Sequence, residues 1–344
     1  MSGFNRFWAM RIGPTSQLLP KRGVIAAIAL IVATIAVAVV STGMGETNYS
    51  PIEVLKVLLG SGTEDQVLVI QTFRLPRIIC ALLVGLSLGA AGAIMQGVAR
   101  NPLASPDILG ITGGASVAAV AFLTLFETMS IQFLPFAAFL GSAVVSAILY
   151  GLAWKNGVTP MRLVLIGIGI KAIMAALTTT LIVKAPIYLT AKAMTWLTGS
   201  LYGTQWTDVI MLLPWTVVLL GLSMVFARNM NALQMGESIA AGIGSAVQRQ
   251  QFVLILMCVG LSGAAVGIGG AIGFVALLAP HIAKQLVGPS FETMLPVSAV
   301  VGAFIVTSAD LIGRVAFSPI DVPVGAITSA IGAPFFIYLL YKNS

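Results

Sequence analysis

Long apolar runs, separated by short charged stretches, constrain this chain more than any other feature of its sequence. A transmembrane helix needs about 20 mostly apolar residues. The expected spans are Gly23–Gly43, Ile78–Val98, Ile108–Phe126, Phe133–Ala153, Leu163–Val183, Val209–Ala227, Phe252–Ile268, Ile272–Lys284, Thr293–Ala309 and Val322–Tyr341. The eighth is short and glycine-rich, and the glycines before it leave its bounds and its separation from the seventh span open. The predicted fold class is all-α, a polytopic membrane protein of about ten transmembrane helices.

Composition supports the same interpretation. Of the 344 residues, 58% are hydrophobic and only 8% are charged, whereas a soluble domain carries about 25% charged residues. The spans and their loops occupy most of the chain, so residues 1–344 are expected to form one transmembrane domain. The net charge of +7 is dispersed along the sequence, which argues against nucleic-acid binding. Cys80 and Cys258 lie in apolar runs and are interpreted as small core residues rather than as a disulfide.

The distribution of basic residues predicts the orientation. An even number of spans places both termini on one side of the membrane. That side gathers most of the basic residues, among them Arg6, Arg11, Lys21, Arg22, Arg100, Lys155, Arg162, Arg228 and Arg249. Because cytoplasmic loops are enriched in Lys and Arg, we expect both termini in the cytoplasm and the chain in the cytoplasmic (inner) membrane. The run Gly23–Gly43 is longer than the apolar region of a signal peptide, so we expect it to remain as the first helix.

Three connecting segments are predicted to contain short helices. Ser50–Glu53 resembles a capped helix start with proline in the first turn. Residues 191–202 are expected to form a short helix on the outer side. The polar segment 229–251 lies inside, and a short helix bounded by glycines is expected over residues 231–244. Its apolar Leu233, Ile239 and Ile243 fit either a groove on a partner protein or the lipid headgroups.

Small residues recur four apart at Gly85 and Gly89, and again at Gly263 and Gly267. This spacing is typical of helices that approach closely in a membrane. The surrounding stretches, residues 86–92 and 261–267, also resemble each other. They would run in opposite directions across the membrane, as inverted repeats of transporters do.

Few side chains suggest chemistry. Arg74 and Arg77 flank a proline and would form a cationic edge, either at the lipid interface or for docking an acidic partner. The segment 101–107 contains two prolines and is interpreted as a turn or a gate. Lys171 and Asp310 fall inside predicted spans, where charges are costly and often functional.

Motifs for catalysis are absent from the sequence. There is no phosphate-binding Gly-x-x-x-x-Gly-Lys-Ser/Thr loop, and no catalytic serine elbow or zinc-protease motif. His281 is a lone histidine without a cysteine or carboxylate cluster, so we expect no metal site and no cofactor. The chain is therefore not expected to be an enzyme. If it transports uphill, the ATPase must be another chain.

Several stretches together resemble the permease subunits of bacterial ABC importers for iron-siderophores, haem or vitamin B12, a type II importer family. They occur in the family's order over nearly the whole chain, at residues 73–77, 92–96, 100–110, 199–201, 235–237, 273–277, 279–283, 295–298, 309–310, 323–325 and 332–334. The sequence departs from the family pattern at Ala276, Lys284 and Asp321.

The resemblance implies roles for particular residues. Arg74, Arg77 and Arg314 look like the outer arginines that meet a substrate-binding protein. Asn101, Pro102 and Leu103 fall at the family's cytoplasmic gate. The contact with the ATPase would use Met235, Gly236, Glu237, Ala240, Gly242 and Gly244.

The resemblance also implies partners and a function. We expect two cytosolic ABC ATPase subunits, an extracytoplasmic siderophore-binding protein and a second permease subunit, in a homodimer or heterodimer. The expected function is ATP-driven import of an iron-siderophore complex. Haem or cobalamin is the alternative cargo, and an ion-driven secondary transporter is the alternative mechanism.

Overall fold

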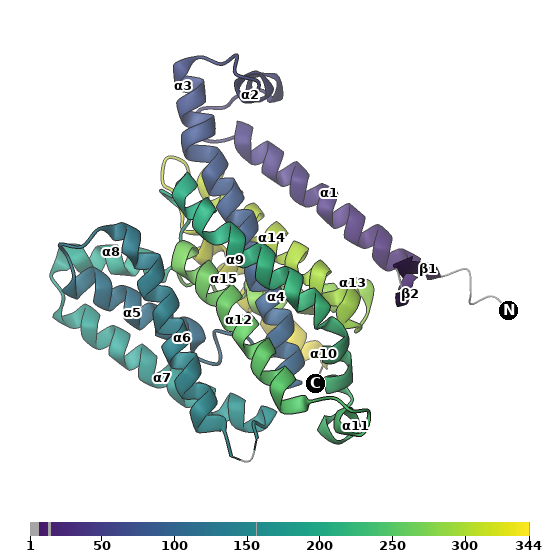
Figure 1. Cartoon of the computed structure of the whole chain (residues 1–344). Helices are drawn as coiled ribbons and strands as arrows, with labels where there is room; N and C mark the ends of the chain where they lie inside the picture. The colour runs from purple at the N-terminus through teal and green to yellow at the C-terminus, as the bar shows by residue number, and fades with distance from the viewer. Residues whose placement is uncertain (1–6, 13–14, 156, 344) are drawn as a thin grey trace.

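The computed structural model describes residues 7–12, 15–155 and 157–343, and Arg6 lies outside them. In this part of the chain, seven helical stretches are long and apolar enough to cross a membrane, and three apolar stretches are shorter, Ile111–Leu125, Val275–Val287 and Val324–Tyr338. They form one bundle (Figure 1). The bounds are α1 (Lys21–Gly43), α3 (Glu64–Val67) continued by η2 (Leu68–Arg74) and α4 (Leu75–Ala99), α5 (Ile111–Leu125), α6 (Leu134–Ala153), α7 (Pro160–Lys184), α9 (Trp206–Val225), α12 (Val247–Gly269), α13 (Val275–Val287), α14 (Phe291–Val315) and α15 (Val324–Asn343).

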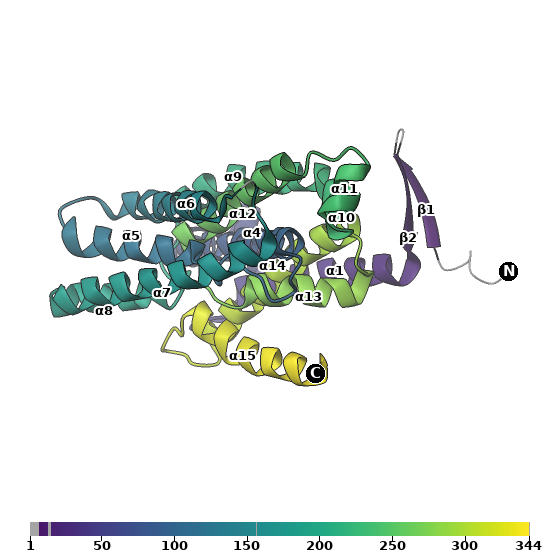
Figure 2. The same cartoon turned by 90° about the horizontal axis from the view of Figure 1, so that it is seen from below.

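The predicted all-α membrane fold is confirmed, because each expected span overlaps one of these helices. A small antiparallel hairpin precedes α1, formed by β1 (Phe7–Ile12) and β2 (Thr15–Pro20) (Figure 2). From the sequence, this stretch was expected only to carry basic residues of the cytoplasmic side, and no strand was predicted. Six residues pair in each strand, too few to alter the class of the fold.

Helix α4 lies at the centre of the bundle and packs against α14, α12 and α13. Gly85 and Gly89 face the backbone carbonyl oxygens of Gly302 and Ser298 on α14, so closely that a Cβ atom at either glycine would overlap them. The Ser298 hydroxyl donates to the Gly89 carbonyl oxygen at 2.8 Å. The predicted close packing at Gly85 and Gly89 is therefore confirmed, and it follows from the missing side chains.

The separation of the seventh and eighth spans, which the sequence left open, is present as two distinct helices. Helix α12 ends at Gly269, and Gly270 has φ 70°. Glycine adopts this left-handed conformation without the steric cost that a Cβ atom brings. Phe274, at the start of α13, has φ 66° and is an uncommon non-glycine residue in that region.

Short helices lie at two opposite ends of the bundle (Figure 1). Helix α2 (Pro51–Leu58) and α3 lie at one end, which we call the Arg77 end. As predicted, α2 starts at a capping box in which Ser50 and Glu53 exchange hydrogen bonds. Helix α8 (Ile187–Leu197) begins before the predicted residue 191 and ends before 202.

At the other end, which we call the Glu237 end, lie α10 (Ala227–Gln234) and α11 (Glu237–Gly242). The prediction of one helix over residues 231–244 is wrong. Gly236 has φ 109° and separates two helices. A glycine that only flanks a helix in the sequence can instead turn the backbone within the segment.

Candidate functional site

A buried ion-pair cluster lies at the Arg77 end. Arg77 Nε donates to Asp310 Oδ1 at 2.8 Å, which joins α4 to α14. Its two terminal nitrogens donate to both carboxylate oxygens of Asp321, in the α14–α15 loop, at 2.5 and 2.9 Å. The Asp310 side chain is 1% exposed and that of Arg77 is 9% exposed. Planar guanidinium groups form such two-pronged contacts with carboxylates more readily than lysine can.

The other two arginines of this end bind the last turn of α1. Arg74 donates to the carbonyl oxygens of Thr42 and Gly43 at 2.9 and 3.1 Å, and to that of Thr47 at 2.6 Å. Arg314 donates to the carbonyl oxygen of Ser41 at 2.6 Å. Carbonyls at a helix C-terminus are unpaired acceptors, and cations are favourable there.

The structure therefore brings Arg74, Arg77 and Arg314 to one end of the bundle but does not leave them as an exposed cationic edge. Arg74 and Arg77 are 6% and 7% exposed as residues. The sequence did not indicate this burial, because the partners Asp310 and Asp321 lie more than 200 positions away. A role in docking stays a proposal.

Two neighbouring cavities at this end were not anticipated from the sequence. One, of about 610 Å³, is lined by Arg77 together with Phe73 and Trp206. The other, of about 490 Å³, extends to Lys192 and Asp208. Both are lined by the loop before α9, through Tyr202, Gly203, Thr204 and Gln205, and by Thr207 in the first turn of α9. The polar and aromatic composition of residues 202–207, between two apolar helices, is the sequence signal that could have indicated them.

The predicted gate residues lie in an irregular segment, Arg100–Gly110, which we call the gate segment. It connects α4 to α5, which at 15 residues is too short to span a bilayer alone. The Asn101 side-chain oxygen accepts from the Leu103 backbone N–H at 2.9 Å. Pro102 and Leu103 are exposed, whereas residues 104–106 are buried. The exposed residues Pro102 and Leu103 are therefore followed directly by a buried part of the segment.

The residues predicted to contact an ATPase gather at the Glu237 end. Met235, Ile239 and Ile243 are exposed, as are Gly242 and Gly244. Ala240 is fully buried and anchors α11 to the bundle, and Leu233 is also buried rather than available to a partner. Glu237 accepts hydrogen bonds from Arg100 at 2.8 Å and from Gln251 at 3.4 Å. The structure thus joins the predicted coupling residues to the first residue of the gate segment.

The two charges predicted inside spans have separate partners. Asp310 binds Arg77, as described above, and Lys171 Nζ lies 2.9 Å from Asp107 Oδ2. The Lys171 and Asp107 side chains are 46% and 49% exposed. Because charges at membrane depth are costly in lipid, this part of α7 requires water or protein beside it.

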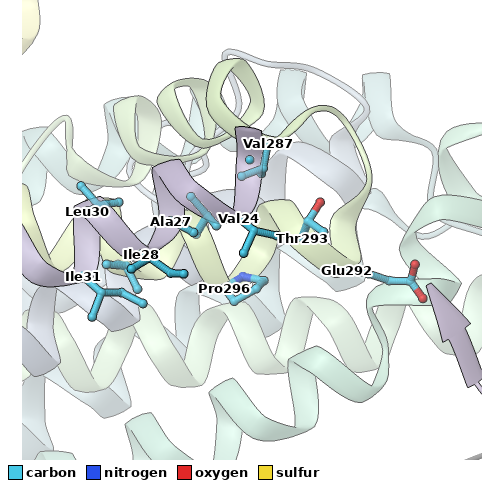
Figure 3. A pocket seen from close by; sticks show the side chains of 12 residues that line it. Val24, Ala27, Ile28, Leu30, Ile31, Val287, Glu292, Thr293 and Pro296 are labelled. Carbon is cyan, nitrogen blue, oxygen red and sulfur yellow. The ribbon is translucent and has the colours of Figure 1, made fainter. Parts of the chain in front are cut away.

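An apolar groove of about 290 Å³ lies between α1 and the α13–α14 corner. Figure 3 shows Val24, Ala27 and Ile28 of α1 on one side and Pro296 of α14 on the other. Glu292 is the charged residue of its lining. A groove of this composition suits an apolar chain rather than a polar solute.

Comparison with known proteins identifies the family. The sequence profile of the FecCD transport family matches residues 25–342. The chain belongs to the FecCD transport family. This FecCD chain is 48% identical over 340 residues to the Probable siderophore transport system permease protein YfhA of Bacillus subtilis (strain 168), covering 97% of this chain and 98% of that one. It is 46% identical to the Achromobactin transport system permease protein CbrC of Dickeya dadantii (strain 3937), covering 90% and 89% of the two chains.

Other FecCD relatives and a solved structure agree with this assignment. The Cobalamin import system permease protein BtuC of Halobacterium salinarum is 41% identical, over 80% of this chain and 74% of that one. A solved inward-facing ABC transporter, assigned to the metal-chelate type, superposes with a TM-score of 0.83 at 27% identity, covering 92% of this chain and 99% of that one. The chain is therefore a multi-pass transport permease of the inner membrane.

Proposed function

We propose that this FecCD chain is the membrane-spanning permease subunit of an ATP-driven importer, and that its cargo is an iron-siderophore complex. The agreement with YfhA and CbrC over nearly the full length of both chains carries the proposal. The permease supplies the path, and ATP binding and hydrolysis by a partner supply the difference in free energy between its two states.

Cobalamin is the second candidate cargo, because a cobalamin permease is 41% identical to this chain. Haem finds no comparable support among the relatives named here. An ion-driven mechanism would need titratable groups along a path. Lys171 and Asp310, which could have formed one, instead have separate local partners.

The two ends of the bundle support an orientation and a set of partners. Arg100, Arg228 in α10 and Arg249 in the first turn of α12 lie at the Glu237 end, which supports a cytoplasmic position for that end and for both termini. Two ATPase subunits would contact α11 there. The exposed Met235, Ile239 and Ile243 suit a groove on such a partner.

A second permease subunit would cover helices that are largely exposed in the single chain. Only about a sixth of α7 is buried, although it carries the half-exposed Lys171–Asp107 pair. A homodimer or heterodimer that encloses a water-filled path beside α7 would satisfy both observations. The surrounding lipid would meet α1, which is apolar and mostly exposed.

At the Arg77 end, a substrate-binding protein would dock from outside. Arg77 lines the 610 Å³ cavity, so an acidic side chain of a partner could approach it from that side. Arg74 and Arg314 would shape the same surface by fixing the end of α1.

Reconstitution tests the function. Liposomes containing the chain, with its ATPase and binding-protein partners, are supplied with radioactive iron bound to hydroxamate, catecholate or carboxylate siderophores, or with labelled cobalamin. ATP-dependent uptake of one iron chelate is expected. Uptake of cobalamin alone would overturn the cargo assignment, and uptake driven by an ion gradient without ATP would overturn the mechanism.

A test of Arg77 in docking needs a control for loss of stability, because Arg77 also forms a buried ion pair with Asp310. Arg77→Gln and Asp310→Asn both break the buried pair, but only the first removes the positive charge from the cavity. We expect binding-protein affinity at low salt to fall in Arg77→Gln and to stay near wild type in Asp310→Asn. Equal affinities in the two variants would exclude Arg77 from the docking surface.

A further inference from the structure

The gate segment is tied at both of its ends by ion pairs to elements far away in the sequence. Arg100 Nη2 lies 2.8 Å from Glu237 Oε1 of α11. At the other end, Asp107 Oδ2 lies 2.9 Å from Lys171 Nζ of α7. The exposed Pro102 and Leu103 lie between these two attachments. The gate segment is thus attached to other elements at both ends, and its tip is exposed.

Backbone conformation and backbone proximity, as well as the ion pair, hold Arg100 beside α11. Arg100 ends α4 with φ 47°, a left-handed conformation that is rare outside glycine and asparagine. The backbone of Gly236 also comes close, since a Cβ atom added there would lie 4.0 Å from Arg100 Nη1. Glu237 is the first residue of α11 and also accepts from Gln251 of α12. A displacement of α11 therefore acts directly on the residue that precedes Asn101.

The attachment at Asp107 is made by three groups. Its Oδ1 accepts from the Thr112 hydroxyl at 2.8 Å, while Oδ2 meets Lys171. Gly110 lies directly against the backbone of Lys171, with room for no more than a tight Cβ contact at 3.0 Å. This end of the gate segment therefore lies about 16 Å along α7 from Pro160. Irregular backbone at that depth of the membrane must face protein or water.

Both ion pairs are exposed enough for water to replace their contacts at little cost. The Arg100 and Glu237 side chains are 31% and 33% exposed, and those of Lys171 and Asp107 are about half exposed. Exposed pairs contribute at most about 1 kcal/mol each. They can position the gate segment in one state of the transporter and still allow it to leave that state.

We propose that the Arg100–Glu237 ion pair is the linkage through which movement of α11 opens and closes the gate segment, and that the Asp107–Lys171 pair is the fixed end against which the segment moves. The inference rests on the proposed function, since it needs an ATPase that moves α11. Arg100, Glu237, Asp107 and Lys171 are positioning residues in this scheme. They act on Asn101–Leu103 and need not touch the cargo.

The test is a charge exchange in the complete transporter reconstituted in liposomes. Arg100→Gln and Glu237→Gln are each compared with the double exchange Arg100→Glu with Glu237→Arg. The matched control is Arg228→Gln, which breaks another exposed ion pair of the same end, Arg228–Glu292. We measure iron-chelate uptake for each ATP hydrolysed.

Each single variant is expected to lower uptake per ATP by about fivefold, the factor that corresponds to about 1 kcal/mol. The double exchange should restore most of it, and the control should stay near wild type. Full coupling in Arg100→Gln would overturn the proposal. So would loss in Glu237→Gln without rescue by the exchange, because Glu237 would then act on the ATPase directly, and the proposed function would survive.

A second measurement works even where a variant transports poorly. Cys80 and Cys258 are buried, so a cysteine introduced by Leu103→Cys can be labelled selectively with a water-soluble maleimide. In the wild-type background its labelling rate should change on ATP addition. In Arg100→Gln the rate should no longer respond to ATP, and in Lys171→Met it should be high throughout. A nucleotide response that survives in Arg100→Gln would overturn the linkage.

Discussion

The two ends of this permease handle charge in opposite ways. At the Arg77 end, Arg77 and Asp310 are almost completely buried, and Asp321 closes the cluster from the loop. At the Glu237 end, ion pairs such as Arg100–Glu237 and Arg228–Glu292 are a fifth to a half exposed. The ion pairs at the two ends therefore have similar N–O distances but very different exposure to water.

The difference teaches which contacts specify the structure and which can change during function. A buried pair is costly to break, because the remaining charge is left without water or a partner. An exposed pair is replaced by water at little cost. The Arg77 end is thus expected to be rigid, whereas the Glu237 end can rearrange.

Asp310→Ala should give the largest loss of stability. It leaves the Arg77 guanidinium buried with only Asp321 as a partner, which should lower the free energy of unfolding by about 3 kcal/mol or more. Thermal unfolding in detergent, followed by intrinsic fluorescence and by the loss of monodisperse protein, measures the effect. A variant as stable as the wild type would show that the two ends do not differ in this way.

Asp321→Ala should have an intermediate effect. Its carboxylate accepts two hydrogen bonds from Arg77, but its side chain is 24% exposed. Water can replace part of the contact, so we expect a loss of about 1–2 kcal/mol. The same thermal assay applies, and a loss that equals or exceeds that of Asp310→Ala would contradict the importance of burial.

Arg228→Ala tests the exposed end. The Arg228 side chain is 51% exposed, and its Nε lies 2.6 Å from Glu292. We expect the free energy of unfolding, obtained from the thermal assay, to fall by less than about 1 kcal/mol. The difference from wild type should shrink further as salt is raised. A loss as large as that of Asp321→Ala, unaffected by salt, would remove the contrast between the ends.

The smallest effect is expected from Glu53→Gln, in the cap of α2. The backbone N–H and hydroxyl of Ser50 donate to Glu53, and these hydrogen bonds lower its pKa below the ordinary value. A lowered pKa stabilises the folded cap above the ordinary pKa of a glutamate, and this stability is lost as the pH falls through the lowered value.

Hydrogen exchange of the α2 amides measures this prediction. Protection in the wild type should exceed that in Glu53→Gln near neutral pH, and the difference should disappear in acid. Glu46→Gln, in the loop before α2, is the control. A difference between wild type and Glu53→Gln that grows on acidification would contradict the assigned cause.

The spans could be predicted from sequence because length and hydropathy act locally, residue by residue. The close approach at Gly85 and Gly89 was predictable for the same reason. The burial of Arg77 was not, because it depends on carboxylates brought close only by the packing of α4 against α14 and the loop that follows it. The break at Gly236 was missed because a glycine next to a helical pattern fits a cap and an interruption equally well.

The candidate gate and coupling residues were placed by resemblance, but their connection was not. Nothing in the spacing of Arg100 and Glu237 indicates a contact, since 137 positions separate them. The pairing of Lys171 with Asp107 was missed for a related reason. Asp107 was placed only in a segment interpreted as a turn or a gate, whereas that segment extends along α7 to the level of Lys171.

The continuous helical stretch from Glu64 to Ala99 contains 36 residues, which corresponds to about 54 Å. The apolar part of a bilayer is only about 30 Å thick, so this rod emerges into water. Arg74 and Arg77 lie on it toward one side, and Arg100 follows its last turn. If this rod tilts about its middle, its two ends move in opposite directions. Such a tilt would couple movement at one surface of the membrane to movement at the other.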